Sequence, residues 1–287
     1  MDAREPMEEG SVELAEMRER FRADWRGVLT DKATLPKYRT VVWSRGERLF
    51  ADDDGDRADR IATEVEDVKD AADPWLWHAY MGQVEIKCAW KAARQRLGQH
   101  GDRRGLCDFR AHLQLAQAHF KTATEIDDKL PHPYAGMITV SMGESTGDHM
   151  ALWRKAIERQ IDYMPAYEAY RQAIRPRWGG TVPEMLRLAN WCVATKRFDT
   201  AVPGQVISII WDLQSEYDAP LNLCEMATLG PLVQRAMDGY LAYNSDVPDN
   251  WISPWRKARR SPGTTRWSNT SRRGGCWRRW TAFRTSP

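Results

Sequence analysis

Residues 169–191, AYRQAIRPRWGGTVPEMLRLANW, join the end of one predicted helix to the start of the next. Helix-forming residues run up to the PRWGG sequence, where Pro176 bars helix continuation and pushes Arg175 towards an extended backbone. Gly179 and Gly180 permit the positive φ angles that a tight reversal needs. The stretch therefore predicts two helices joined by a short, rigid turn.

The second of these helices has a clear start signal. Thr181 is a good N-cap residue, and Glu184, three positions later, completes a capping box. Apolar residues then recur at helical spacing, which predicts an inward stripe of Met185, Leu188, Ala189 and Cys192.

Trp178 and Arg177 sit inside the turn. We expect Trp178 to fill the groove between adjacent helix pairs, where its loss would cost roughly 3–5 kcal/mol. Packing does not explain Arg177, so the alternative is that Arg177 and Trp178 together contact a ligand.

The rest of the chain also has helical periodicity, with almost no strand-like alternation. Asp73 is a predicted N-cap and Pro74 a predicted first helical residue. A polar connection is expected at 99–108. The predicted helices cover residues 11–29, 37–50, 57–72, 73–97, 112–126, 130–142 and 149–161. The expected inward residues include Val65, Val68, Leu113, Ala116, Phe120, Ala123, Trp153, Ala156, Ile157 and Ile161.

A short internal repeat supports a helix-turn-helix solenoid. Three residues recur after 33 positions, because Phe120, Ala123 and Tyr134 correspond to Trp153, Ala156 and Tyr167. A large aromatic residue, a small residue three positions later and a proline-containing turn are typical of helical repeats with a period near 34 residues.

The chain has 287 residues, of which 42% are hydrophobic and 29% charged, as in ordinary globular proteins. Of its 42 basic and 40 acidic residues, ten basic and no acidic ones lie in 254–287, which leaves 32 basic and 40 acidic residues in 1–253. We therefore predict an N-terminal helical region at 1–72, a helical-repeat domain at 73–253 and a basic tail at 254–287.

The tail is rich in Arg, Trp, Ser, Thr and Gly and loses the helical periodicity. A genuine basic arm with Trp residues would bind nucleic acid or an anionic surface. The alternative, which we favour, is a disordered or out-of-frame tail, since GC-rich codons read out of frame give these residue types. The acidic remainder argues against a general nucleic-acid surface.

The sequence YMPAYEAYRQAIRPRWGGTVPEMLRLA, with TKRFDTAVPGQVI after it, resembles the bacterial family called domain of unknown function 4034. The similar elements are a Tyr-Pro-Ala helix at Tyr163, a Pro-Arg-Trp-Gly-Gly turn beginning at Pro176 and an Arg-Phe-Asp-Thr segment beginning at Arg197. The resemblance covers roughly residues 75–215 and implies a tetratricopeptide-like fold. It implies no catalytic residue and no ligand.

No motif of a known catalytic class is present, and we expect no cofactor, no metal and no catalytic residue. The five Cys residues form no C-x-x-C pair. His112 and His119 are seven positions apart, too far for an i, i+4 metal pair. An open alternative is a metal-dependent hydrolase in which His78 joins these two histidines.

The first residues lack an apolar core and no run of eighteen apolar residues exists, so we expect no signal peptide, no membrane partner and a cytoplasmic protein.

These observations together predict an all-α, tetratricopeptide-like solenoid with an irregular C-terminal tail. Its most favoured function is that of a protein- or peptide-binding scaffold rather than an enzyme. The candidate groove residues are Trp75, Tyr80, Trp90, Tyr134, Tyr167, Tyr170, Arg177 and Trp178. The structural signature of the turn is Pro176, Arg177, Trp178, Gly179, Gly180, Thr181 and Glu184.

Overall fold

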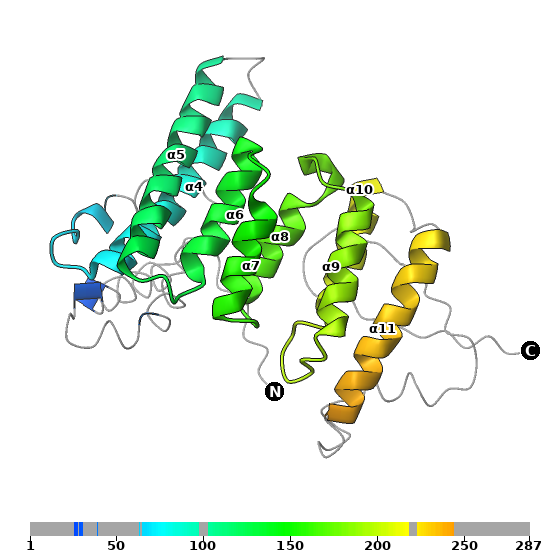
Figure 1. Cartoon of the computed structure of the whole chain (residues 1–287). Coiled ribbons are helices and arrows are strands. Elements are labelled where there is room, and N and C mark those ends of the chain that lie inside the picture. The colour runs from blue at the N-terminus through cyan, green and yellow to red at the C-terminus, as the bar shows by residue number, and fades with distance from the viewer. Residues whose placement is uncertain are drawn as a thin grey trace, which may run out of the picture. The chain divides into compact units, whose positions relative to one another are not determined.

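The computed structural model describes residues 26–27, 29–30, 39, 63, 65–97, 103–217 and 223–243. Within these residues the structure has eight α-helices, one 3-10 helix and no β-strand (Figure 1), so the all-α prediction is confirmed. The elements are α4 (Pro74–Leu97), α5 (Arg103–Ile126), α6 (His132–Glu144), α7 (His149–Arg159), α8 (Met164–Ala173), η1 (Pro176–Trp178), α9 (Val182–Ala194), α10 (Gln205–Tyr217) and α11 (Leu223–Tyr243).

The chain divides into two compact units, residues 1–185 and 186–287. The predicted domain boundaries at 72/73 and 253/254 stay predictions. The tail at 254–287 lies outside the described residues. The predicted helices at 11–29 and 37–50 also lie outside them, except for a few positions. None of the described helices is both long and apolar enough to cross a membrane.

In the first unit, each helix packs against its neighbours in the sequence. Helix α4 lies beside α5, α5 beside α6, and α6 contacts both α7 and α8 (Figure 1). One core cluster joins Leu29 and Val65 to the buried residues of α4, including Trp75 and Leu76. The predicted inward stripe of α5 is confirmed, because Leu113, Ala116, Phe120 and Ala123 are all 0% exposed.

Phe120 fills a space that two glycines leave open between three helices. An ideal Cβ built on Gly82 of α4 would come within 2.5 Å of the Phe120 ring, and one built on Gly136 of α6 within 2.2 Å. Neither glycine can therefore carry a side chain while Phe120 keeps its place. The Phe120 ring, which belongs to α5, lies between the backbones of α4 and α6.

The six repeat residues are all buried. Phe120, Ala123 and Ala156 are fully buried, and Trp153 is 5% exposed. The two tyrosines that follow, Tyr134 and Tyr167, are 6% and 0% exposed. The residues that recur after 33 positions therefore occupy the core in both copies, although the second copy replaces Phe by Trp.

Ionic contacts fix the start of α4. Asp73 accepts a hydrogen bond from the Leu76 amide at 3.0 Å, which confirms it as the N-cap of a helix that begins at Pro74. The Arg39 guanidinium bridges Asp73 and Asp127, with N–O distances of 2.9 Å to each. These side chains are mostly buried, so the ion pairs tie the residue before α4 to the turn after α5.

Three expectations about helix limits and faces were wrong. Residues 67–72, predicted as the end of a helix at 57–72, form a turn instead. The polar connection predicted at 99–108 is shorter, because α5 already begins at Arg103. The residues from Arg103 to Asp108 form the first turns of α5. Phe109, the next residue, is buried and packs against Trp90, with 5.1 Å between ring centroids. In α7, Trp153 and Ala156 are buried as predicted, whereas Ile157 is only half-buried. Ile161, also half-buried, lies beyond the helix, which ends at Arg159.

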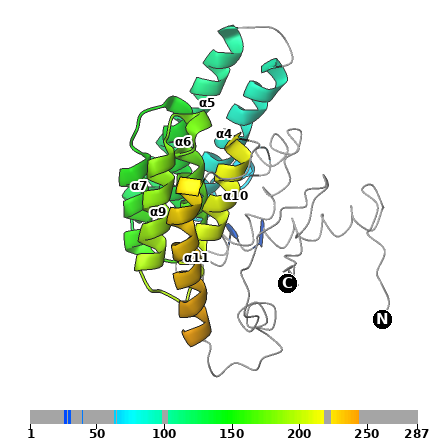
Figure 2. The same ribbon diagram turned by 90° about the vertical axis from the view of Figure 1, so that its right-hand side faces the viewer.

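In the second unit, α10 packs beside α11 (Figure 2). The Phe198 ring, which follows α9, lies against Gly239 of α11, where an ideal Cβ would come within 2.0 Å of it. The neighbouring Tyr240 meets the Phe198 ring edge to face, with 5.6 Å between centroids. A glycine again lets an aromatic ring approach a helix backbone.

We expect Gly136→Ala to lower the free energy of unfolding by about 1–3 kcal/mol, because the new methyl group overlaps the fixed Phe120 ring. Gly143→Ala on the same helix is the matched control. There the Cβ would meet one methyl group of Leu113 at 2.6 Å and the Phe109 ring at 3.2 Å, rather than three atoms of one ring within 2.8 Å, so a smaller loss is expected. Urea unfolding followed by circular dichroism measures both, and equal losses would contradict this account of the Phe120 site.

His132 should make stability depend on pH. This side chain is 1% exposed and packs between Trp75 and Tyr163, and its burial lowers its pKa from 6.5 to about 3. Between these values the unfolded chain binds a proton that the folded chain does not, so stability falls as the pH drops below 6.5. At pH 5 the loss relative to neutral pH is about 2 kcal/mol.

His132→Leu should remove that contribution. Unfolding curves at pH 7 and pH 5 for the variant and the wild type give the difference directly. If both proteins lose the same stability between these pH values, His132 is not the group responsible.

Candidate functional site

The turn after α8 has the predicted backbone with one correction. Arg175 is extended, with φ −70° and ψ 145°, and residues Pro176–Trp178 form a 3-10 turn. Gly179 has the expected positive φ of 90°. Gly180 does not. It is needed for a different reason, because an ideal Cβ there would lie 2.1 Å from the carbonyl oxygen of Ile174.

Thr181 caps the start of α9 as predicted. The Glu184 amide donates to the Thr181 hydroxyl at 3.4 Å, and that hydroxyl donates to the Glu184 carboxylate at 2.9 Å. The stripe of Met185, Leu188, Ala189 and Cys192 is buried, at 0–4% exposure, which confirms it. The turn is therefore constrained by hydrogen bonds and close contacts on both sides.

Trp178 does not fill a groove, and that expectation is corrected. It is 38% exposed, and its ring meets Trp90 of α4 edge to face, with 5.4 Å between centroids and an interplanar angle of 77°. Trp90 is half-buried, and its other contact is with Phe109. Arg177, next to Trp178, is exposed. The turn thus presents an aromatic pair and a guanidinium group at the surface.

The other five groove candidates are core residues in the described structure. Trp75 donates from its indole to the Asp127 carbonyl at 3.2 Å, and the Tyr167 hydroxyl donates to the Ile161 carbonyl at 2.7 Å. Their exposures leave almost no surface for a ligand: Trp75, Tyr80 and Tyr167 are 0% exposed, Tyr170 is 4% and Tyr134 is 6%. Of the eight candidates, Trp90, Arg177 and Trp178 keep surface that a partner can reach, and their binding role stays a prediction.

Periodicity alone could not separate these two groups. Tyr170 stacks on Trp153 at 4.8 Å and 13°, and Tyr134 is covered by the Arg159 guanidinium at 4.4 Å from its ring. Both tyrosines lie on helices whose neighbours enclose them. Trp178 lies in a turn, where one side remains open.

The histidines of the hydrolase alternative separate into two pairs. His78 and His119 approach each other, with 3.0 Å between their Nδ1 atoms. His112 instead contacts the Glu85 carboxylate at 2.6 Å. Among the residues that the structure describes, no group of three or more His, Cys, Asp or Glu side chains is arranged to hold a metal ion.

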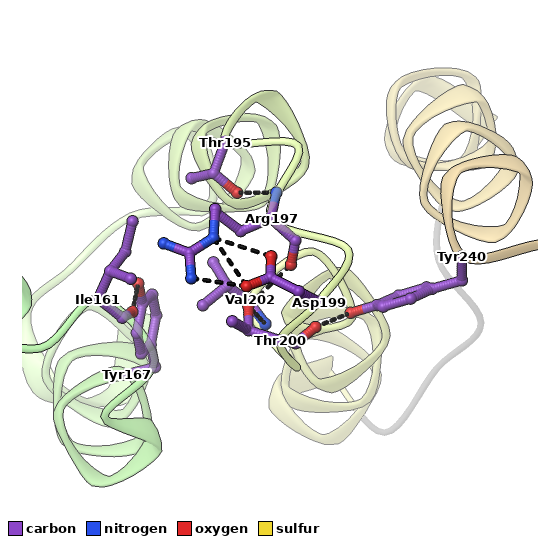
Figure 3. A network of polar contacts seen from close by, with 8 residues as sticks. All are labelled: Ile161, Tyr167, Thr195, Arg197, Asp199, Thr200, Val202 and Tyr240. Atoms are coloured by element: carbon purple, nitrogen blue, oxygen red, sulfur yellow. Dashed lines mark hydrogen bonds and ion pairs between the residues drawn. The ribbon is translucent and has the colours of Figure 1, made fainter. Parts of the chain in front are cut away.

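A polar network that sequence reasoning missed shapes the loop between α9 and α10 (Figure 3). Arg197 donates to both carboxylate oxygens of Asp199 at 2.7–3.1 Å, and this contact lowers the pKa of Asp199. The Tyr240 hydroxyl donates to the Thr200 carbonyl at 2.8 Å and accepts from the Gly204 amide at 3.1 Å. The network joins the loop to α11, which indicates a structural role.

Searches against protein-family models, curated proteins and solved structures found no match. The resemblance to the family called domain of unknown function 4034 therefore stays a prediction.

We expect Gly180→Ala to destabilise the turn more than Gly179→Ala. At Gly179 an added Cβ meets nothing within 4 Å, so the cost is that of a positive φ alone, about 1–2 kcal/mol. At Gly180 the methyl group overlaps the backbone of Ile174, and α8 or the turn must move. Urea unfolding of the two variants checks the order, and a milder loss for Gly180→Ala would show that the turn is more compliant than described.

Proposed function

We propose that this protein is a peptide-binding helical scaffold whose contact surface is the Trp178–Trp90 pair with Arg177. The observation that carries the proposal is a Trp that remains 38% exposed although its backbone is fixed by a closely packed turn. Trp and Arg are the residue types that most often dominate binding energy at protein interfaces.

The rigidity of the turn favours binding. Gly180 donates from its amide to the Arg175 carbonyl at 3.1 Å, and Trp90 holds one edge of the Trp178 ring. A side chain that is already ordered loses little conformational entropy when a partner covers it. The exposed ring can thus contribute its apolar area to an interface at a small entropic cost.

Arg177 indicates the chemistry of the partner. Its guanidinium recognises carboxylates with paired hydrogen bonds, and its positive charge opposes cationic ligands. Lys87 lies one turn before Trp90 on α4 and adds a second positive charge. The surface therefore suits an acidic peptide segment that places an aromatic side chain or a proline against the two Trp rings.

A tetratricopeptide-like solenoid is part of the same proposal. It is supported by the burial of all six repeat residues and by the contacts of α6 with both α7 and α8. Such repeats cannot bury their apolar faces alone and commonly present extended binding surfaces. A cytoplasmic location also belongs to this proposal.

The two alternatives receive less support. A hydrolase would need a third ligand beside His78 and His119, whereas His112 faces Glu85. Nucleic-acid binding through the basic tail concerns residues 254–287, which lie outside the described residues, and it stays a prediction.

The test uses the full chain and a displayed library of short peptides, from which the tightest binder is synthesised and its affinity measured by calorimetry. Trp178→Ala should weaken that affinity by about 2 kcal/mol or more, as at interface hot spots. Trp211→Ala is the matched control, because Trp211 is also exposed, at 49%, but lies on α10.

Arg177→Glu adds a test of the partner chemistry. The change should weaken an acidic peptide and leave a neutral one with the same aromatic residue less affected. Selection of no peptide, or equal effects of Trp178→Ala and Trp211→Ala, would contradict the proposed function.

A further inference from the structure

His78 and His119 form a pair of possible metal ligands outside the proposed binding surface. His78 lies on α4 and His119 on α5, and their Nδ1 atoms are 3.0 Å apart. Both rings are half-buried, so one side of the pair can be reached by solvent. The Trp77 ring meets both edge to face, with 4.8 and 5.2 Å between centroids, and restricts how they can turn.

The separation of the two nitrogens matches two adjacent ligands of one metal ion. Imidazole nitrogens bind Zn²⁺ at about 2.0–2.1 Å, and two such bonds to atoms 3.0 Å apart enclose an angle of about 90°. We propose that His78 and His119 form a two-histidine site for a divalent transition-metal ion, which links α4 to α5.

Metal binding needs both rings neutral and a change in the hydrogen bond that they share. Burial is the main cause that lowers the pKa of both rings, to about 4 for His119, and both are therefore neutral at pH 7. Their contact needs one Nδ1–H group as donor. Binding replaces that hydrogen bond, with both protons on Nε2 and both Nδ1 lone pairs on the metal. The two rings must rotate slightly for these lone pairs to converge.

Two charged groups near the pair act in opposite directions. Lys69 lies over the Trp77 ring, with Nζ at 4.8 Å from its centroid, and its charge disfavours a cation. Glu66, which pairs with Lys69 at 3.3 Å, favours one. The Glu66–Lys69 pair is exposed, so solvent screens both charges and the affinity depends mainly on the two imidazoles.

The ligand set selects the kind of metal. Imidazole suits Cu²⁺, Ni²⁺ and Zn²⁺, whereas Mg²⁺ and Ca²⁺ prefer oxygen. The described residues provide no group of three or more ligands, so water fills the remaining positions. The site is expected to be weaker than a structural zinc site with four protein ligands.

Calorimetric titration of the full chain with Ni²⁺ at pH 7.5 tests this inference. Wild type should bind one more Ni²⁺ per chain than His119→Gln and than His78→Gln. His112→Gln is the matched control on the same helix, and because His112 faces Glu85 it should retain wild-type binding. Cys107→Ser, which removes an exposed thiol, should also retain it.

A second readout separates loss of the site from loss of folding. Ni²⁺ should raise the Tm of the wild type and of His112→Gln, since an ion that binds only the folded chain stabilises it. It should not raise the Tm of folded His119→Gln, and Mg²⁺ should affect none of them. The proposal would be overturned if all variants gave the same titrations and the same Tm shifts. It would also be overturned if only those variants that fail to fold lost Ni²⁺ binding.

Discussion

The first unit depends on one packing constraint, the Phe120 ring enclosed between Gly82 and Gly136. Because neither glycine has a side chain, the backbones of α4 and α6 both closely approach a ring that belongs to α5. Larger residues at either position would force the three helices apart. Helix α6, placed in this way, contacts α7 and α8 in turn, so the position of one aromatic ring affects every later helix of that unit.

The exposed turn is a consequence of this packing together with local backbone chemistry. Helix α8 ends at Ala173, and Pro176 prevents its continuation. Gly180 brings the chain against the Ile174 carbonyl, which leaves Trp178 beside Trp90 with part of its surface open. This contrast between a fixed backbone and an open ring is the observation on which the proposed binding surface rests.

Local signals in the sequence were enough for most helices of the first unit, for the caps of α4 and α9 and for the buried stripes of α5 and α9, but not for the start of α5 or the inward face of α7. Pro74, Asp73 and Thr181 act through neighbouring backbone groups, so their roles can be predicted without the fold. The exposure of Trp178 and the burial of Tyr80 or Tyr167 depend on which helices meet, and periodicity contains no such information. The approach of His78 to His119, 41 positions apart, was one part of the open hydrolase alternative, whereas the separation of His112 from this pair could not be predicted from spacing. Gly180 was given the wrong role because a close contact and a positive φ favour the same residue.

The central claim is that a partner covers Trp178 and Trp90. The most direct measurement is ¹⁹F NMR of the chain labelled with 5-fluorotryptophan, with resonances assigned by single Trp→Phe variants and recorded with and without the selected peptide. The Trp178 and Trp90 resonances should shift, while those of the buried Trp75 and Trp153 stay in place. Saturable peptide binding that leaves the Trp178 resonance unchanged would contradict the claim.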